Sequence, residues 1–562
     1  MSKSPEVTPV AKTRNRWIGL VFISMAISLV IIDGTIVNTI FPSIIKDLKL
    51  TSTEVQWVQE SYVLVFASLL LVWGTIGDRI GRRRLLMIGI LIFIAASVWA
   101  GFSSDAGSMI LARIVQGVGG AMVLPTTLSL VNATFHGKER GIAFAIWGST
   151  IGGMVAVGPV LGGWLATDFD WRWAFNINAP LGIIIVIGLL MFATESKVAE
   201  QVGKIDIVGA AISVVMFSTL VFGLIEGRTY GWWNVNEANP FVIGDFAWPT
   251  SGISVIPVSL AIFLISTVLF VMWERKREAA NKNVILDLRL FHIASFRNGS
   301  IAAGIISMGE FGLLFAIPLW LQNVEGLSAV SSGLVLLWLA GGAFLASGVG
   351  GALNGKLSAV NAVRLGVFLE LVAVGGIAFV ASSAGGWVGI APFLAIYGIG
   401  VGLATAQLTG VIMVEVPIEK IGQASGSQST VRQIGSALGI AVLGTVLFTA
   451  TQSAAETHLK DTAFVSSMPS VGLQNDFIDG LTTAVVDSAG GALPAVGKIA
   501  MSARATAEQA AEVQAAANDG FTDGVKATGW AAAGFLFLGL LSTFSMGARR
   551  RPESAKETAA KA

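Results

Sequence analysis

The chain has 562 residues, of which 54% are hydrophobic and 13% are charged, and its net charge is +1. This composition is too apolar for a soluble protein of this length, and the balanced charge gives no indication of a nucleic-acid partner. Cysteine is absent, which excludes disulfides, thiolate metal sites and cysteine nucleophiles. The sequence contains no G-x-x-x-x-G-K-[ST] segment, nucleophile triad or cluster of metal ligands, so we expect neither an enzyme nor a bound cofactor or metal.

Apolar runs of the length of a membrane span recur along the whole chain. A spanning helix needs about 20 mostly apolar residues, and we find fourteen such runs. The first run lacks a small-residue cleavage site, so it is expected to remain as a span rather than to be removed as a signal peptide. We therefore predict an all-α integral membrane protein with 14 transmembrane helices. The expected helices are 17–37 (stopping at Pro42), 55–76, 85–103, 108–133, 141–166, 176–194, 206–225, 252–273, 299–321, 331–353, 362–382, 388–414, 424–450 and 527–547.

The basic residues predict how these helices are oriented. If both termini are cytoplasmic, most of the 36 Lys and Arg residues lie in cytoplasmic segments, which is the side on which such residues are retained. An even number of spans agrees with this arrangement. We expect a multi-pass protein of the cell membrane. The eight basic residues on the outer side are Lys46, Lys49, Arg172, Arg228, Lys460, Lys498, Arg504 and Lys526.

A short basic segment joins the second and third expected helices and reads G-x-x-x-D-R-x-G-R-R from Gly74. It resembles the cytoplasmic signature of the major facilitator superfamily of secondary transporters. In that family the aspartate contacts the other half of the protein in one conformation only, which biases the transport motion. The residues of this conformational motif are Gly74, Asp78, Arg79, Gly81, Arg82 and Arg83.

Four further motifs resemble the fourteen-helix drug:proton antiporters, the branch that includes quaternary-ammonium efflux pumps. This resemblance covers nearly the whole chain except residues 451–526. The motifs are R-x-x-Q-G-x-G-G-A from Arg113, G-P-x-x-G-G from Gly158, W-R-W-A-F-N-I-N-A-P-L-G from Trp171 and L-D-L-R-L-F from Leu286.

The resemblance implies two pseudo-symmetric six-helix halves with two inserted helices. A weak copy of the basic segment, starting at Gly351 after the tenth expected helix, agrees with this division. The expected parts are a cytoplasmic tail (1–16), the N-terminal half (17–194), the inserted helices with flanking loops (195–282), helices 9 to 13 (283–450), an extracytoplasmic loop (451–526), the last helix (527–547) and a cytoplasmic tail (548–562).

The Gly-Pro motif of the fifth expected helix resembles the antiporter signature of the superfamily. A proline removes a helix hydrogen bond, and small residues let helices approach closely. The resemblance implies that the motif seals one side of the cavity and favours export, and ordinary close packing is the alternative. The family usually has glycine at the position of Met154. The motif residues are Gly158, Pro159, Gly162 and Gly163.

Ionisable residues within the spans are the main candidates for proton coupling and substrate binding, because a charge in hydrocarbon is costly. Asp33 lies about 24 Å from the inner end of the first expected helix, in its outer half. Arg113 lies about five residues from the outer end of the fourth expected helix, which runs the opposite way, so the two residues lie at a similar depth. The resemblance implies that both of these helices line the central cavity, so we infer that the two residues are close and that Arg113 tunes the proton affinity of Asp33, with a static structural pair as the alternative. Glu310, near the middle of the ninth expected helix, suits a cationic substrate, a proton, or both in exchange.

Other residues are weaker candidates. Phe311 and Phe315 suit stacking on an organic cation, and core packing explains them equally well. Glu370 lies in a helix expected to be peripheral, and Arg432 is interpreted as structural. The lower-ranked cavity residues are Asn38, Glu60, Gln116, Phe311, Phe315 and Gln407.

Residues 451–526 form one long polar stretch outside the expected spans. The run 503–517 is rich in alanine and therefore prone to form a helix. Loops of this length are usually functional or disordered, and we predict a short helical hairpin that caps the outer mouth.

These features together predict a proton-coupled antiporter that exports lipophilic cationic drugs or biocides by alternating access. Its partners would be a small substrate, protons and the lipid bilayer, and we expect a monomer. One alternative is a dedicated exporter of a single antibiotic or natural metabolite. A more remote one is a non-transporting membrane receptor or scaffold, against which the acids within the spans argue.

Overall fold

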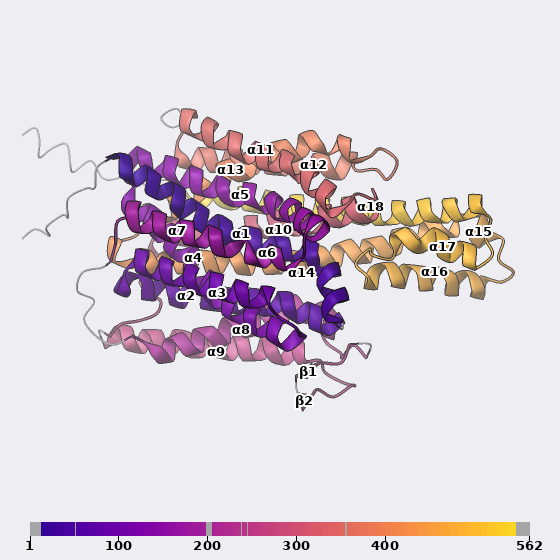
Figure 1. Cartoon of the computed structure of the whole chain (residues 1–562), viewed down its shortest axis with the longest axis horizontal. Coiled ribbons are helices and arrows are strands. Elements are labelled where there is room, and N and C mark those ends of the chain that lie inside the picture. The colour runs from indigo at the N-terminus through magenta and orange to yellow at the C-terminus, as the bar shows by residue number, and fades with distance from the viewer. Residues whose placement is uncertain are drawn as a thin grey trace, which may run out of the picture.

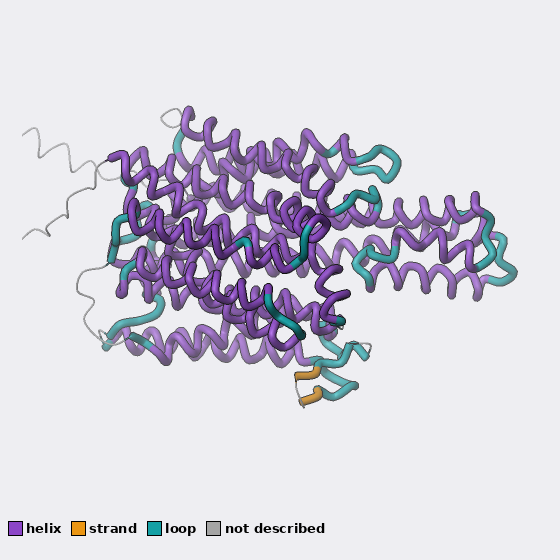
Figure 2. Tube along the Cα trace, in the orientation of Figure 1, coloured by secondary structure: helices purple, strands orange, loops and turns teal. Residues whose placement is uncertain are grey.

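The computed structural model describes residues 13–50, 52–197, 205–237, 239–243, 246–280, 282–353 and 357–546. Long helices run side by side along the longest axis of the molecule (Figure 1), and the strands among the described residues form one short antiparallel pair (Figure 2). Thirteen of the described helices are long and apolar enough to cross a membrane. The predicted all-α membrane fold is thus confirmed. The fifth expected span corresponds to α5 (Gly137–Asp168), in which the described apolar part is Val157–Ala166.

The described residues up to 197 contain seven helices. Helix α4 has a side-chain cap, because the Asp105 side chain accepts a hydrogen bond from the Ser108 backbone N–H at 2.9 Å. These helices are α1 (Thr13–Leu48), α2 (Ser52–Ile80), α3 (Arg82–Gly101), α4 (Ala106–Thr134), α5, α6 (Arg172–Asn176) and α7 (Asn178–Phe192).

Two peripheral helices follow and pack mainly on each other and on α2. They are α8 (Ile207–Tyr230) and α9 (Val255–Ala279), joined through the antiparallel pair β1 (Val242–Ile243) and β2 (Phe246–Ala247). They lie along one edge of the bundle in Figure 1.

The remaining helices form the other part of the bundle and an extension. The bundle contains α10 (Ala294–Asn323), α11 (Ala329–Leu353), α12 (Ala359–Val380), α13 (Ala391–Met413), α14 (Ile421–Lys460) and α18 (Ala507–Thr543). The extension adds α15 (Ala463–Ser466), α16 (Val471–Asp487) and α17 (Val496–Ser502). Short 3₁₀ helices cover Leu288–His292, Trp387–Gly389, Ile418–Lys420, Leu493–Ala495 and Phe544–Met546.

We call the end of the bundle that carries Gly74–Arg84 the inner end, and the end from which α14 and α18 project the outer end. The expected ends of several helices are wrong. Helix α1 does not stop at Pro42 but continues to Leu48, because Ile40 and Ile44 are fully buried in a cluster with Phe175. This packing stabilises a turn that the proline alone would disfavour.

The stretch 451–526 is helical, as predicted, but it is not a hairpin laid across the outer mouth. Helices α14 and α18 run 40 and 37 residues and extend well beyond the bundle, with α15–α17 stacked lengthwise on them (Figure 1). Ile478, Leu481 and Val485 bury one face of α16, and α16 contacts α14. The apolar positions therefore orient α16 along the extension and away from the mouth.

Candidate functional site

Asp33 lies at the centre of a buried polar network in the first half of the bundle. Its Oδ2 atom pairs with Arg113 Nη1 at 2.7 Å, and both side chains are fully buried. Its Oδ1 atom accepts hydrogen bonds from Gln116 Nε2 and Asn178 Nδ2, each at 2.8 Å. The Arg113 guanidinium also lies over the Tyr62 ring, 4.2 Å from its centroid. The predicted proximity of Asp33 and Arg113 is confirmed.

Two members of this network were missed from the sequence as polar partners. Asn178 donates to Ser97 Oγ at 2.8 Å as well as to Asp33, which links α7, α3 and α1. The signal for Asn178 was present, because it belongs to the motif beginning at Trp171. Ser97 carries no such signal, since a lone serine in an apolar helix is indistinguishable from its neighbours. The network satisfies the carboxylate with one guanidinium and two amides, which a buried charge requires.

A second acidic group lies in the other half of the bundle. Glu310 on α10 is 3.6 Å from Arg432 Nη2 on α14, and its backbone carbonyl accepts a hydrogen bond from Tyr397 Oη at 3.2 Å. Glu370 on α12 is completely buried and interacts electrostatically with both Glu310 and Arg432. Helix α12 packs mainly on α13 and α18, as expected of a peripheral helix, but it turns Glu370 towards α13 and the interior, so the low weight given to this residue needs correction. Arg432 is likewise more than a packing residue, since it is the counterion of Glu310.

The basic motif joins the two halves at the inner end. The Asp78 carboxylate accepts hydrogen bonds from the Gly422 backbone N–H at 2.9 and 3.1 Å and from Arg82 at 2.6 Å. A Cβ at Gly74 would lie 2.5 Å from the Gly422 carbonyl oxygen, so only glycine permits this approach of α2 to α14. The expected contact of Asp78 with the other half is thus present.

The rest of the motif begins α3. Gly81 has φ of 111°, in the region that favours glycine. The Arg83 and Arg84 backbone N–H groups donate to the Glu195 carboxylate at 3.0 and 3.1 Å, and Arg83 Nη1 donates to the Ala193 carbonyl at 2.8 Å. Arg79 lies in the last turn of α2. The motif therefore fixes the start of α3 as well as the contact between halves.

The glycines of the antiporter motif lie where α5 meets two other helices. A Cβ at Gly158 would lie 1.9 Å from Thr35 Oγ1 of α1, and a Cβ at Gly162 would lie 2.8 Å from Ile36. A Cβ at Gly163 would lie 2.3 Å from Val330 of α11. The motif thus permits close packing on both sides of α5, and the helix continues through Pro159.

Several of the lower-ranked cavity residues do not lie together in the structure. Glu60 on α2 faces Glu226 on α8, beside Trp57 and Phe222, so it lies against the peripheral helices and not between the two halves as expected. Phe315 packs edge-on against Phe448 at 6.4 Å, which is core packing. Gln407 is buried within α13, Phe311 is partly buried and the side chain of Asn38 lies outside the described residues.

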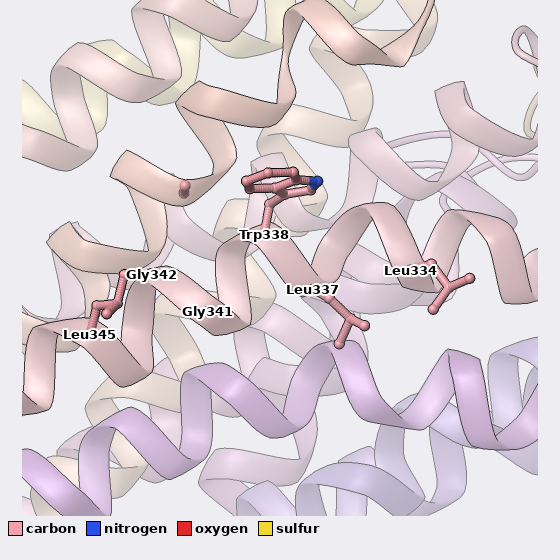
Figure 3. A pocket seen from close by; sticks show the side chains of 7 residues that line it. Leu334, Leu337, Trp338, Gly341, Gly342 and Leu345 are labelled. Atoms are coloured by element: carbon pink, nitrogen blue, oxygen red, sulfur yellow. The ribbon is translucent and has the colours of Figure 1, made fainter.

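An apolar groove runs along the exposed side of α11, away from the interior of the bundle (Figure 3). Leu334, Trp338 and Leu345 line it and are about half exposed or more. Such a surface suits contact with lipid tails, and it is separate from both acidic groups. Among the described residues, no group of three or more His, Cys, Asp or Glu is arranged to hold a metal ion.

Comparison with known proteins identifies the family. Residues 23–440 match the family model described as Major Facilitator Superfamily. The chain belongs to the major facilitator superfamily. It is therefore a multi-pass membrane transporter of small molecules and not an enzyme, as the sequence predicted.

The relatives in this superfamily include exporters of antibiotics. The chain is 28% identical to the "Tetracenomycin C resistance and export protein" of Streptomyces glaucescens, over 78% of each chain. It is 30% identical to the "Probable actinorhodin transporter" of Streptomyces coelicolor, over 80% of this chain and 75% of the relative. It is also 30% identical to the "Multidrug resistance protein Stp" of Mycobacterium tuberculosis, over 80% and 79% of the two chains.

Solved structures share the fold. A crystal structure of a human organic anion transporter aligns with a TM-score of 0.56 at 11% identity, covering 94% of this chain and 99% of that one. A bacterial homologue of the human lysosomal transporter Spinster, in an inward-facing and unoccupied conformation, aligns with a TM-score of 0.52 at 15% identity, covering 96% and 100%. At these identities the likeness concerns the fold alone.

Proposed function

We propose that the protein is a proton-coupled antiporter that exports lipophilic cationic drugs or biocides. The observation that carries the proposal is the Asp33 network, in which a fully buried carboxylate is balanced by Arg113, Gln116 and Asn178. A charge placed at such cost within membrane helices is expected to serve transport. The names of relatives such as the multidrug resistance protein Stp support drug export.

In this proposal, proton binding and the motion of the two halves are linked through the charge of Asp33. The ionised carboxylate holds α1, α4 and α7 together through its three partners. A proton on Asp33 would remove the charge that Arg113 compensates and leave one lone pair fewer to accept hydrogen bonds. The network would then loosen, which changes the relative stability of two arrangements of the bundle.

The motif at the inner end supplies the second part of the mechanism. Asp78 binds the Gly422 backbone N–H across the halves, so the inner ends are held together in this conformation. Alternating access requires this contact to break when the inner side opens. The inner end would face the cytoplasm, with both termini cytoplasmic and the extension outside the cell membrane, because of the distribution of Lys and Arg. A monomer would suffice for this cycle.

The first prediction tests Asp33 directly. We expect Asp33→Asn to abolish export of ethidium driven by a pH gradient in membrane vesicles, because the amide cannot bind and release the proton. The control is the elution profile of the purified variant, which should remain that of a folded protein even though its unfolding midpoint falls, because Asn leaves the Arg113 charge unpaired but can still accept the hydrogen bonds from Gln116 and Asn178. Export by the variant at the wild-type rate would remove Asp33 from the mechanism.

A second candidate function is the export of one antibiotic or natural metabolite. It is favoured by the names of two relatives, which concern tetracenomycin C and actinorhodin. Resistance profiling of cells that express the protein, against several unrelated dyes and biocides, separates the two functions. Protection against chemically unrelated cations supports multidrug export, and protection against a single compound supports the dedicated exporter.

A further inference from the structure

We propose that Glu310, Glu370 and Arg432 form a second proton site, in the later half of the bundle, and that Glu370 holds the proton in this conformation. This inference deepens the proposed antiport function and rests on it for its role in transport. It gives a function to Glu370, and it assigns to the transporter one proton that does not pass through Asp33.

The first step is the burial of Glu370. Its side chain is completely inaccessible to solvent, and neither carboxyl oxygen has a hydrogen-bond partner among the described residues. The Glu370 side chain packs against the α13 backbone at Gly400, since a Cβ at Gly400 would lie 2.7 Å from the Glu370 Cγ atom. An ionised carboxylate in such a place would lack both water and hydrogen bonds, at a cost of several kcal/mol.

The second step is the charge balance of the cluster. Two carboxyl groups, Glu310 and Glu370, lie near a single guanidinium, that of Arg432. Arg432 Nη2 is 3.6 Å from Glu310 Oε2, so the one positive charge is already paired. With both acids ionised the cluster would carry an uncompensated negative charge in the membrane interior, and one bound proton makes it neutral. Glu370, which has no ion pair, is the group that carries this proton.

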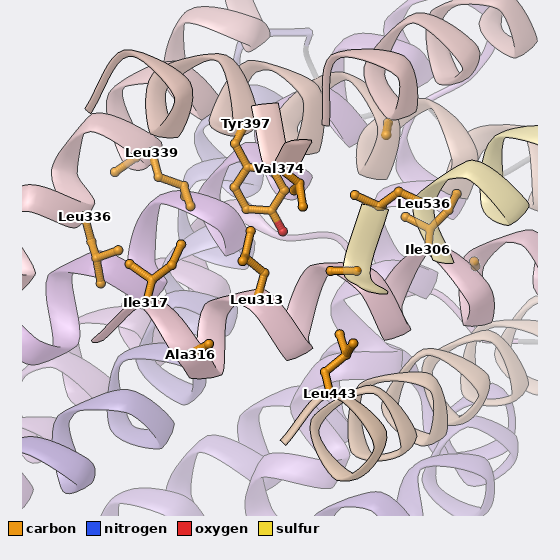
Figure 4. Close-up of a cluster of buried hydrophobic side chains, with 14 of the residues drawn as sticks. Ile306, Leu313, Ala316, Ile317, Leu336, Leu339, Val374, Tyr397, Leu443 and Leu536 are labelled. Carbon is orange, nitrogen blue, oxygen red and sulfur yellow. The ribbon is translucent and has the colours of Figure 1, made fainter. Parts of the chain in front are cut away.

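Within the part of the chain that the structure describes, the surroundings offer no other charge to stabilise an ionised Glu370. The titratable or charged groups that face it are Glu310 on α10, Arg432 on α14 and Tyr397 on α13. Helix α18 meets α12 further along the helix, with Trp530 near Gly375 and Gly529 near Ala378. The Tyr397 hydroxyl donates to the Glu310 backbone carbonyl, and its ring lies among apolar side chains such as Leu313 and Val374 (Figure 4).

The site suggests how a cation and a proton exchange. An organic cation near Glu310 would compete with Arg432 for that carboxylate and free the guanidinium to pair with Glu370. The O–H bond of the Glu370 carboxyl then breaks, and its proton passes to water that enters with the opening of the bundle. Without the cation the cluster then carries one negative charge, which the bound cation balances, so one proton leaves for each single positive charge that binds.

The number of protonated carboxyl groups is measurable without transport, from the infrared absorption of the carboxylic acid C=O bond. We would record it at pH 7 for the purified full-length protein without substrate. Glu370→Gln should lose one protonated carboxyl relative to wild type. Glu310→Gln should also lose one, because Arg432 becomes free to pair with Glu370. Arg432→Gln should gain one, because no guanidinium remains to hold Glu310 ionised.

Glu415→Gln is the matched control, since Glu415 is an exposed glutamate at the end of α13 that accepts a hydrogen bond from Ser295 at 2.7 Å, and its spectrum should match wild type. An unchanged signal in Glu370→Gln, or no gain in Arg432→Gln, would overturn the site. If either Glu370→Gln or Arg432→Gln fails to fold, the spectrum of the other variant still tests the proposed site. Because this readout needs no export, a protein with the predicted spectra that moves no cation would refute the antiport function and leave the site standing.

Discussion

Asp33 and Arg113 show how a buried charge is made tolerable by its neighbours. The carboxylate accepts hydrogen bonds from the guanidinium and from two amides, and the guanidinium lies against an aromatic face. Removing one partner of a buried ion pair typically costs about 3–5 kcal/mol, because the other charge is left unpaired. Substitutions in this network therefore affect both stability and proton binding, and an experiment has to separate the two.

The second prediction concerns Arg113. Arg113→Ala removes the positive charge that favours the ionised form of the neighbouring carboxylate, so Asp33 should release its proton only at higher pH. The pH optimum of cation export should move upward. Arg113→Lys is the control, because it retains the positive charge and should keep the optimum near that of wild type. An unchanged pH profile in a folded Arg113→Ala protein would show that the pair does not set proton binding.

For single residues, the sequence predicts well only those contacts that follow from the depth of a residue along its helix. Asp33 and Arg113 were predicted to be neighbours from their distances to the helix ends and from the resemblance to a family in which both helices line the cavity, and they are neighbours. The environment of Glu370 could not be predicted, because it depends on which face α12 turns towards α13. That orientation is set by the close crossing at Gly366 and Gly400, which no single-helix pattern reveals. The position of Glu60 against α8 escaped prediction for the same reason.

Among the connecting elements, the segment after α9 is fixed to the start of α14 by Asp287. Its carboxylate pairs with Arg289 at 3.0 Å and with Lys420, and the Asp287 backbone N–H donates to Gln423 Oε1 at 3.0 Å. Burial opposes ionisation, but the hydrogen bonds from Arg289 and Lys420 outweigh it and lower the pKa of Asp287 from 3.8 to about 2. The motif that begins at Leu286 therefore holds the segment after α9 against the start of α14 at the inner end.

The third prediction follows from this lowered pKa. A carboxyl whose pKa is lower in the folded state stabilises the protein above its unfolded pKa, and the contribution disappears as the pH falls through the folded pKa. Asp287→Asn should therefore lower the free energy of unfolding by roughly 2 kcal/mol at pH 7. The difference from wild type should shrink between pH 3.8 and about 2. Thermal unfolding in detergent at several pH values measures this.

Asp479→Asn serves as the comparison, because Asp479 is exposed on α16, and it should leave the unfolding midpoint nearly unchanged. A loss of stability in Asp287→Asn that stays constant as the pH falls would contradict the stabilising role of the ionised Asp287.

Helix ends were the least predictable feature at this scale. The expected spans begin and end where the apolar runs do, but α14 and α18 continue far beyond them. Their outer turns are polar on one face and bury residues such as Leu459 and Val513 on the other. An amphipathic helix that packs on a neighbour does not need an apolar run, so a search for membrane spans stops too early.

At the scale of the whole molecule, the extension is the feature that the family resemblance did not cover. It projects from the outer end (Figure 1) and is tied to α8 by Arg228, which donates to the Val486 carbonyl at 3.1 Å and lies over the Phe448 ring. Its helices move with α14 and α18, to which they are joined. A rocking motion of the later half would therefore carry the extension with it.

The fourth prediction tests whether this coupling matters. Residues 462–506 would be replaced by a short Gly-Ser linker, with Leu459 and Val513 made polar because they lose their cover. We expect the affinity for a cation to stay roughly as in wild type, since both acidic groups lie in the bundle, and the export rate to change. Equilibrium binding and vesicle transport of ethidium separate the two quantities. A loss of binding would place the substrate site in the extension, against this account.

The all-α membrane architecture follows from span length and charge, because the bilayer admits few alternatives, whereas its two groups of helices were expected from the family resemblance and the weak internal repeat. The close packing of α5 was expected from the glycines of its motif, but its partners α1 and α11 were not predicted. What the sequence does not provide is how the long helices continue outside the membrane, where that constraint ends.

Exchange of a cation for protons can be measured as proton release on cation binding. The purified protein in weakly buffered detergent solution would be titrated with tetraphenylphosphonium and ethidium, and the protons released would be counted with a pH indicator. The account predicts stoichiometric release on binding, reduced in Asp33→Asn and in Glu370→Gln. Saturable binding of these cations with no proton release in the wild-type protein would contradict it.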